Sequence, residues 1–554
     1  MKDLPHKVFA DFFEQRQPGL GALARLVLQK LEEGHLCLDL STLQQTESGD
    51  YIPSAILRPG PYVTDNPKEV KPFVLYGGNV YFQRYFKYES IIVQKIKALV
   101  QEEQHGQQER QELLYQHFSQ QEVQQMLPAL LNHFCIITGG PGTGKTTLIG
   151  KVLEILYTID PDLKVALAAP TGKAAARMNE SLAALKNKFS QIPAASTVHR
   201  LLGAIQGSVF FKHHAERLLE YDLIIIDESS MIDGALMAKL LDAVDPKKRI
   251  VFLGDKDQLA SVEAGSVFGD LCNAAFTKGS VIENHIIHLT KSHRFNPEKG
   301  IGLFSRSVLE GDTSCVQQFT DNPDQELSID TRYSQTAFED YIKEYLEYIR
   351  EPDTAKALEK LNRVKVLCAV REGPYGVYHT NRRIEDYLTE QTRGNEAYHS
   401  IRPMYGFYHN QPVMVTANRY DLGLFNGDVG LIRYEYPPQP GAAPPPLYAW
   451  FPGPEGTLLK VPPGYLTGYE TVFAMTVNKS QGSEADRILV LLPEQKEIQL
   501  LTRELLYTAV TRAKKQVLVQ GTQEVLEHAI RQKITRISGL EARLQNKNDD
   551  IWEP

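Results

Sequence analysis

The sequence of 554 residues lacks the features of membrane, secreted and zinc-binding proteins. No apolar run approaches the roughly 18 residues that a membrane-spanning helix needs, and the N-terminal Met-Lys-Asp-Leu-Pro has no signal-peptide core. The five cysteines are scattered without a C-x-x-C pair, which argues against a disulfide framework and a zinc site. Cys37, Cys135 and Cys368 lie in apolar runs and are expected in the core. We expect a soluble, cytoplasmic protein.

An excess of positive charge is also absent. The chain has 60 Lys and Arg against 68 Asp and Glu, a net charge of -8. Any binding to nucleic acid must therefore come from a local basic surface rather than from a global attraction. The hydrophobic content of 42% and the charged content of 23% are ordinary for a globular protein. The length allows about three or four domains.

The most informative motif is a glycine-rich loop, Gly139-Gly-Pro-Gly-Thr-Gly-Lys-Thr146, which matches the pattern G-x-x-x-x-G-K-[ST]. An apolar, strand-like run precedes it and helical apolar spacing follows it, so a chance glycine-rich turn is a poor alternative. Backbone N–H groups of such a loop cradle phosphates. Lys145 would reach the β- and γ-phosphates, and the Thr146 hydroxyl would bind Mg²⁺. The predicted nucleotide-binding residues here are Gly139, Gly140, Pro141, Gly142, Thr143, Gly144, Lys145, Thr146 and Thr147.

Two carboxylates follow the apolar run 223–226 directly. Asp227 would hold the Mg²⁺, and Glu228 would orient and deprotonate the attacking water. In isolation, such a pair could equally cap a helix. The phosphate-binding loop about 80 residues earlier favours the catalytic interpretation.

Three further polar residues complete the predicted catalytic set. Gln258 follows another strand-like run, and its amide can hydrogen-bond both a γ-phosphate and a second domain. Phosphoryl transfer needs additional positive charge, and Arg294 and Arg512 are the candidates. Taken singly, either arginine could also belong to a surface salt bridge.

The order of strand-like and helical patterns predicts an α/β protein. Strand-like runs at 134–137, 164–169, 223–226 and 250–253 alternate with helical patterns, which indicates a parallel sheet with crossover helices. Short strands and the proline-rich loop Pro437–Pro446 interrupt a second α/β segment. The predicted domains are an N-terminal unit at 1–105, a first motor domain at 106–290, a second at 291–401 and 469–554, and a β insertion at 402–468.

Several strings together resemble superfamily 1 DNA helicases, nearest to the RecD type, the alpha subunits of exodeoxyribonuclease V (RecBCD). They are the loop at 139–146, Ala169-Pro-Thr-Gly-Lys-Ala-Ala-Ala-Arg177, Asp227-Glu-Ser-Ser230, Gly254-Asp-Lys-Asp-Gln258 and Ala474-Met-Thr-Val-Asn-Lys-Ser-Gln-Gly-Ser-Glu484. The resemblance runs from roughly residue 10 to 525. It implies two RecA-like P-loop motor domains, an SH3-like β-barrel insertion and a small N-terminal domain that docks on another subunit.

The resemblance also implies an activity. It predicts an ATP- and Mg²⁺-dependent helicase that travels 5′ to 3′ on single-stranded DNA. It predicts RecB-like and RecC-like partners, action at double-stranded DNA ends in break repair, and a bacterial cytoplasmic location. About 40 residues follow Arg512, too few for a nuclease domain, so nuclease activity is expected from partners.

Site residues follow from the resemblance as well. Glu484 matches a position that contacts the nucleotide ribose, and Gln121 or its neighbour Gln120 matches a glutamine that reads adenine. Asn478 stands where the family usually has histidine. The implied DNA-binding residues are Pro170, Thr171, Lys173, Thr197, His199, Asn418, Asn426, Thr476, Lys479 and Ser480.

Three alternatives stay open at this point. A stand-alone RecD-like helicase usually carries a longer N-terminal extension, which is not found here, so a complex-bound subunit is expected. A non-catalytic scaffold with a vestigial motor conflicts with the intact set of catalytic residues. A P-loop kinase or other ATPase leaves the predicted DNA-contacting loops unexplained.

Overall fold

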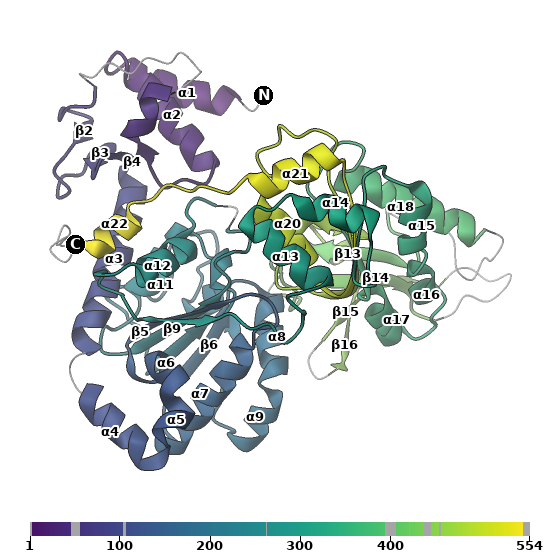
Figure 1. Ribbon diagram of the computed structural model, residues 1–554, viewed down its shortest axis with the longest axis horizontal. Helices are drawn as coiled ribbons and strands as arrows, with labels where there is room; N and C mark the ends of the chain where they lie inside the picture. Colours follow the sequence, from purple (N-terminus) through teal and green to yellow (C-terminus); the bar gives the residue numbers. More distant parts are fainter. Residues whose placement is uncertain are drawn as a thin grey trace.

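The computed structural model describes residues 3–45, 56–103, 107–261, 263–393, 406–419, 421–436, 445–453 and 456–546. Most of the predicted proline-rich loop, residues 437–444, lies outside the described residues. The described chain forms two α/β lobes side by side, with the N-terminal unit above the first lobe (Figure 1). None of the helices in the described ranges has the length and apolar character to span a bilayer.

The first lobe is built on a six-stranded parallel sheet in the order β10-β5-β9-β8-β6-β7. All residues of β5, β6 and β8 are buried, as expected when helices cover both faces of a parallel sheet. The predicted strand runs are thereby confirmed. The strands are β5 (Phe134–Gly139), β6 (Val165–Ala169), β7 (Ser196–Thr197), β8 (Leu223–Ile226), β9 (Arg249–Gly254) and β10 (Ile286–Leu289).

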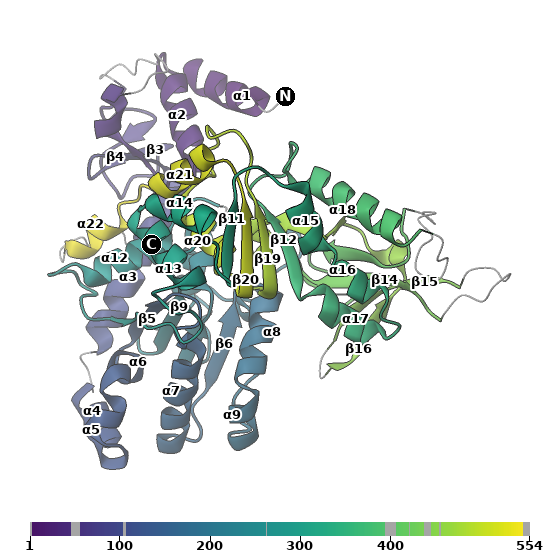
Figure 2. The same cartoon turned by 45° about the vertical axis from the view of Figure 1, so that its right-hand side comes forward.

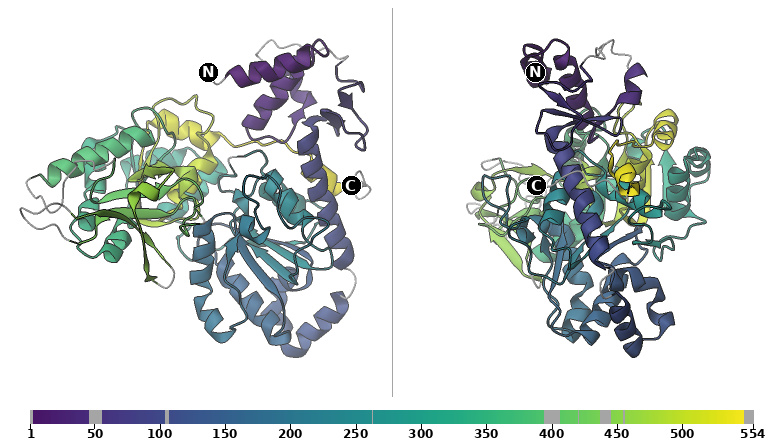
Figure 3. Two further views of the ribbon diagram at one scale, coloured as in Figure 1. Left: turned by 180° about the vertical axis from the view of Figure 1, so that it is seen from behind. Right: turned by 90° about the vertical axis from the view of Figure 1, so that its left-hand side faces the viewer.

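Helices on both sides of this sheet bury two separate apolar clusters. Figure 3 shows the helices flanking the strands from behind. The helices are α4 (Gln107–His117), α5 (Gln120–Val123), α6 (Leu127–Leu131), α7 (Lys145–Ile159), α8 (Gly172–Ser181), α9 (Ala183–Lys188), α10 (Val198–Leu201), α11 (Gly234–Asp242) and α12 (Val267–Phe276).

The second lobe has a five-stranded parallel sheet in the order β11-β20-β19-β12-β18 (Figure 2). Its strands are β11 (Leu327–Asp330), β12 (Val364–Cys368), β18 (Ala474–Thr476), β19 (Ala485–Leu491) and β20 (Ala513–Gln520). Its helices are α13 (Gly300–Glu310), α14 (Ser314–Asp321), α15 (Gln335–Ile342), α16 (Tyr345–Ile349), α17 (Thr354–Leu361), α18 (Val377–Gln391), α19 (Val477–Ser480), α20 (Arg503–Val510) and α21 (Gln523–Arg531).

An antiparallel sheet interrupts the second lobe, in the order β16-β15-β14-β13-β17. It extends past the predicted limit at residue 468, because β17 returns to pair with β13 through Val413 and Thr471. Its resemblance to an SH3-like barrel stays a prediction. The strands are β13 (Gln411–Val415), β14 (Val429–Tyr434), β15 (Leu447–Pro452), β16 (Leu458–Val461) and β17 (Tyr469–Thr471).

The N-terminal unit combines two helices with a small sheet in the order β1-β4-β3-β2. The following helix, α3 (Gln83–Glu103), was predicted in this unit but packs on α11, and its Ile92 and Ile96 belong to the core of the first lobe. The other elements are α1 (Asp3–Glu14), α2 (Leu20–Glu32), β1 (Leu38–Asp39), β2 (Val63–Thr64), β3 (Phe73–Tyr76) and β4 (Asn79–Phe82).

The C-terminal tail, residues 532–546, corrects the predicted extent of the second lobe. It leaves α21 and crosses to the first lobe, where α22 (Leu540–Gln545) packs against α12 and α3 (Figure 1). Leu540 and Leu544 are fully buried in the core of the first lobe. Their spacing of four residues places both on one face of α22, which explains why this short helix docks there.

Candidate nucleotide and DNA site

The glycine-rich loop joins β5 to α7 and curls around its own lysine. Gly142 and Gly144 have φ values of 75° and 87°, which favour glycine. The Lys145 ammonium donates to the carbonyl oxygens of Gly139 at 2.6 Å and of Gly140 at 3.1 Å. The loop therefore brings a lysine to the amino end of α7, where the helix dipole favours an anion.

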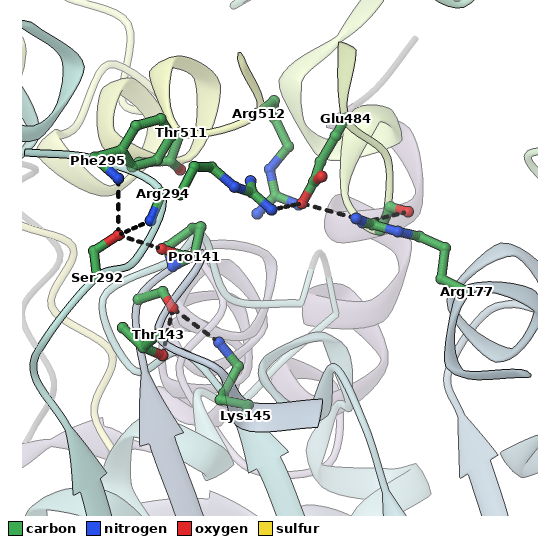
Figure 4. A network of polar contacts seen from close by, with 12 residues as sticks. Pro141, Thr143, Lys145, Arg177, Ser292, Arg294, Phe295, Glu484, Thr511 and Arg512 are labelled. Atoms are coloured by element: carbon green, nitrogen blue, oxygen red, sulfur yellow. Dashed lines mark hydrogen bonds and ion pairs between the residues drawn. The ribbon is translucent and has the colours of Figure 1, made fainter. Parts of the chain in front are cut away.

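One cavity of about 600 Å³ lies against this loop at the seam between the lobes. Residues of the first lobe line it together with Glu484 and Arg512 of the second, and Arg294 reaches it from the segment between the lobes (Figure 4). The two predicted arginines therefore share one cavity with the loop. Of the predicted set, the cavity is lined by Pro141, Gly142, Thr143, Gly144, Lys145, Thr146, Thr147, Asp227, Glu228, Gln258, Arg294, Glu484 and Arg512.

Two carboxylates enter the cavity at the end of β8. Burial, together with the neighbouring Glu228, raises the pKa of Asp227 to about 6, and Lys145 acts in the opposite direction. Glu228 adopts the left-handed conformation with φ of 50°, a strained geometry for a residue other than glycine. Its N–H donates to Asp227 Oδ1 at 2.8 Å, which fixes the Asp227 carboxylate against the backbone.

The donor set suits a hard divalent cation. The Thr146 hydroxyl and the Asp227 carboxylate are oxygen ligands of the kind that Mg²⁺ prefers. The described residues contain no group of three or more His, Cys, Asp or Glu side chains that could hold a metal ion. Two protein ligands fit an ion that takes its remaining ligands from a triphosphate and water, the usual arrangement for Mg²⁺.

A charged chain of side chains crosses the seam beside the cavity. Glu484 Oε1 lies 2.8 Å from Arg177 Nη2 of α8 and 2.8 Å from Arg294 Nη2 (Figure 4). Burial opposes ionisation, but the two guanidiniums hold the pKa of Glu484 below its usual value. Arg294 Nη1 is buried and has no hydrogen-bond partner among the described residues. One donor of the guanidinium is therefore unsatisfied in this arrangement of the lobes.

Arg177 is a site residue that the sequence interpretation did not select. It lies in the quoted string 169–177, one helical turn after Lys173. This spacing places the two side chains on the same face of α8. The ion pair with Glu484 could not be foreseen, because residues far apart in sequence meet here only through the packing of the lobes.

The loop after β9 is also joined to the second lobe. Arg512 Nη2 donates to Gln258 Oε1, and both side chains are buried. The next residue, Leu259, accepts from Gln481 Nε2 at 2.6 Å and donates to Thr508 Oγ1 at 2.8 Å. The position of Gln258 therefore depends on contact between the lobes.

Three predicted DNA-binding threonines play the same local role. Thr197 and Thr476 end strands and Thr171 follows β6 by two residues, and each caps the helix that follows, with hydroxyl-to-amide distances for Thr171, Thr197 and Thr476 of 3.2, 3.2 and 3.4 Å. A β-carbon on Gly172 would lie 2.9 Å from Phe425 of the inserted sheet. The first lobe, the second lobe and the insertion therefore converge near the start of α8.

Most other predicted DNA-binding side chains are at least partly accessible at this junction. Asn418 Oδ1 accepts from the Asn426 amide at 2.9 Å, and Lys479 pairs with Glu470 at 2.6 Å. Pro170, Lys173 and His199 are also partly accessible. Ser480 differs from the prediction: it is fully buried, and its hydroxyl donates to the Val477 carbonyl at 2.6 Å. It closes the turn of α19.

The predicted adenine contact stays a prediction. Gln121 and Gln120 are exposed in the first turn of α5, and neither lines the cavity. Reciprocal hydrogen bonds between Ser119 and Glu122 cap this helix and turn the glutamines toward solvent.

Comparisons with known proteins give a match in each of the two lobes. Residues 120–264 match the family model of an AAA domain, and residues 471–519 match that of a UvrD-like helicase C-terminal domain. The chain is 34% identical over 550 residues to "RecBCD enzyme subunit RecD" of Mycobacterium tuberculosis, covering 94% of this chain and 90% of the relative. Identity to the same subunit of Mycolicibacterium smegmatis is 35%, covering 94% and 92%.

Two further proteins are less similar to this chain. The "ATP-dependent RecD2 DNA helicase" of Deinococcus radiodurans is 31% identical over 77% of this chain and 52% of its own length. Among solved structures, Bacteroides Pif1 bound to ssDNA aligns with a TM-score of 0.40 at 16% identity, covering 74% of this chain and 94% of that one.

Proposed function

The chain belongs to the RecD family of superfamily 1 helicases, and from this membership we propose a specific role. The protein is an ATP-dependent helicase that travels 5′ to 3′ on single-stranded DNA. It works as the alpha subunit of a RecBCD-type complex, with RecB-like and RecC-like partners, in the repair of double-strand breaks in the bacterial cytoplasm. The nuclease activity of the complex comes from the partner subunits.

The observation that carries this proposal is the single cavity shared by the two lobes. Lys145 and the loop hold the triphosphate from the first lobe, Arg512 faces it from the second, and Arg294 lies beside Gly142 on the segment that joins the lobes. Arg294 has an unpartnered buried nitrogen that suits a γ-phosphate oxygen. A γ-phosphate draws both arginines toward the loop, and its release removes that attraction, so nucleotide turnover changes the lobe contact.

Hydrolysis itself needs a base and an ordered water. The Glu228 carboxylate stands beside Asp227 at the cavity wall and takes the proton from the attacking water. Thr146 and Asp227 would hold Mg²⁺, which would neutralise charge on the phosphates.

Helix α8 connects the nucleotide to the DNA. Thr171 caps its start at the junction of the three parts, and Arg177, in its second turn, pairs with Glu484 at the cavity. A rearrangement of Arg294 and Glu484 therefore acts directly on the helix that carries the predicted DNA contacts. Backbone and stacking contacts suit such translocation because they do not depend on sequence.

Displacement of streptavidin from biotinylated oligonucleotides tests travel and direction together. We expect ATP-dependent displacement from a 3′-biotin end, little from a 5′-biotin end, and none with Lys145→Gln. Displacement mainly from the 5′ end would contradict the direction, and displacement by Lys145→Gln would contradict the role of the cavity.

The stand-alone helicase remains the second candidate, because the chain also matches a RecD2 helicase. Affinity purification of the native protein from its own cells separates the two. We expect two partner subunits in stoichiometric amounts. A monomer with full helicase activity would favour the stand-alone enzyme.

A further inference from the structure

A tyrosine from the second lobe reaches both the phosphate-binding loop and the loop after β9. The Tyr507 hydroxyl, on α20, donates to Asp255 Oδ2 at 3.0 Å. A β-carbon placed on Gly140 would lie 2.8 Å from the same hydroxyl, so it lies directly over the phosphate-binding loop. Neither Tyr507 nor Asp255 lines the cavity. Both are buried behind the residues that do.

Asp255 gathers three donors in a buried position. Its carboxylate accepts from the Tyr507 hydroxyl, from Gln258 Nε2 at 3.0 Å and from the Asp257 amide at 3.1 Å. Burial raises the pKa of Asp255, whereas Lys145 and the hydrogen bond from Gln258 lower it. A buried carboxylate with this many donors is held in one place, because losing any one of them leaves charge unsatisfied.

This arrangement allows one orientation of the Gln258 amide. An ionised carboxylate only accepts hydrogen bonds and a guanidinium only donates them. Gln258 must therefore turn its nitrogen to Asp255 and its oxygen to Arg512. While Arg512 donates to the amide oxygen, it occupies the place from which an attacking water would donate to the same oxygen.

We propose that Asp255 and Tyr507 are positioning residues that keep the Gln258 amide in this orientation while Arg512 leaves it for the γ-phosphate. The amide oxygen then becomes free to orient the attacking water, and the nitrogen stays anchored. Because Tyr507 belongs to the second lobe, the anchor is intact only while the lobes are in contact. This inference rests on the proposed ATP hydrolysis in the cavity.

A second buried tyrosine supplies a matched control. The Tyr345 hydroxyl donates to the carbonyl oxygens of Phe473 at 2.9 Å and Val364 at 3.3 Å, both within the second lobe. Removing either hydroxyl costs a similar buried hydrogen bond. Only the hydroxyl of Tyr507 crosses to the first lobe and reaches Gln258 through Asp255.

The first test compares steady-state ATP hydrolysis with saturating single-stranded DNA. Tyr507→Phe and Asp255→Asn are expected to lower kcat by about 10- to 100-fold, as for misplaced catalytic groups, with little change in KM. Tyr345→Phe is expected to keep the wild-type kcat. Equal kcat values for Tyr507→Phe and Tyr345→Phe, at a wild-type melting temperature, would overturn the inference.

A double-mutant cycle shows whether Tyr507 acts through Gln258. If it does, Gln258→Ala/Tyr507→Phe is no slower than Gln258→Ala alone. If the two losses multiply, Tyr507 has an independent role and the inference is wrong. Wild-type protein without DNA-stimulated hydrolysis would instead contradict the proposed function, so the two failures are distinguishable.

Discussion

The two lobes are joined at two seams of opposite character. At the cavity seam, Arg294, Arg512 and Glu484 make charged contacts beside a large open space, and an incoming phosphate can replace the partners of both arginines. At the tail seam, Leu540 and Leu544 of α22 are buried in the core of the first lobe. Side chains at the cavity seam can exchange their hydrogen-bond and ion-pair partners, whereas those at the tail seam keep theirs.

The tail is also held to the rest of the molecule by polar contacts. Ile537 exchanges hydrogen bonds with the segment at His35 and Leu36, both at 2.9 Å. The buried Glu89 accepts from the Gly539 amide at 2.8 Å and pairs with Arg543 at 3.4 Å. Breaking a buried pair of this kind is costly. We conclude that the tail is a fixed tie around which the cavity seam can rearrange.

The largest expected effect is at the cavity seam. Lys145→Gln should lower kcat for ATP at least about 1,000-fold, because the lysine supplies positive charge to the transferred phosphate. Its hydrogen bonds are confined to its own loop, so the melting temperature should not change. Lys164→Gln, an exposed lysine of the same lobe, is the control. A similar rate loss in both variants would contradict the assignment.

Removing an arginine from the same seam should have the next largest effect. Arg512→Ala is expected to lower kcat about 100- to 1,000-fold, since an arginine stabilises charge in the transition state. Arg531→Ala removes an exposed arginine of the same lobe whose guanidinium pairs with Glu527 one turn earlier on α21, and should leave kcat unchanged. Stopped-flow phosphate release measures both. A wild-type rate of phosphate release in Arg512→Ala would show that Arg512 takes no part in hydrolysis.

The tail seam should respond in stability and not in catalysis. Leu544→Ala removes a fully buried side chain and should destabilise the first lobe by about 2–5 kcal/mol. Leu500→Ala, at an exposed position, should cost far less. Denaturant titration measures the loss, and kcat at low temperature should stay near wild type. A large loss of kcat without loss of stability would show that the tail seam takes part in catalysis.

The smallest effect is a pH dependence of the tail. Burial raises the pKa of Asp270, which accepts from Ser538 Oγ at 2.6 Å, from 3.8 to about 7. The folded state then retains this proton where the unfolded state has lost it, so stability falls as pH rises from about 4 through about 7. Asp270→Asn should flatten the change in melting temperature between pH 5.5 and 8. An equal change of melting temperature with pH in the wild type and in Asp270→Asn would contradict this prediction.

Local patterns predicted the elements of the fold and most of the cavity. The apolar runs that became β5, β8 and β9 each end in functional residues, and the carboxyl ends of parallel strands meet at one edge. This rule alone brings Lys145, Asp227 and Gln258 together. The return of the tail to the first lobe was not predictable, because its two leucines carry no information about which surface they cover.

The limits of prediction at the site have the same origin. Gln121 and Ser480 were assigned by resemblance, but a helix cap turns one to solvent and a tight turn buries the other. Arg177 and Tyr507 were missed because their partners, Glu484 and Asp255, lie on the opposite lobe. Residues within one motif are foreseeable, and contacts across the lobe seam require the structure.

The rate of ATP hydrolysis with and without single-stranded DNA tests the central claim most directly. A motor in which α8 joins the DNA surface to the nucleotide cavity should hydrolyse ATP slowly alone and at least about tenfold faster with saturating single strand. A rate that does not change with added DNA would contradict the account.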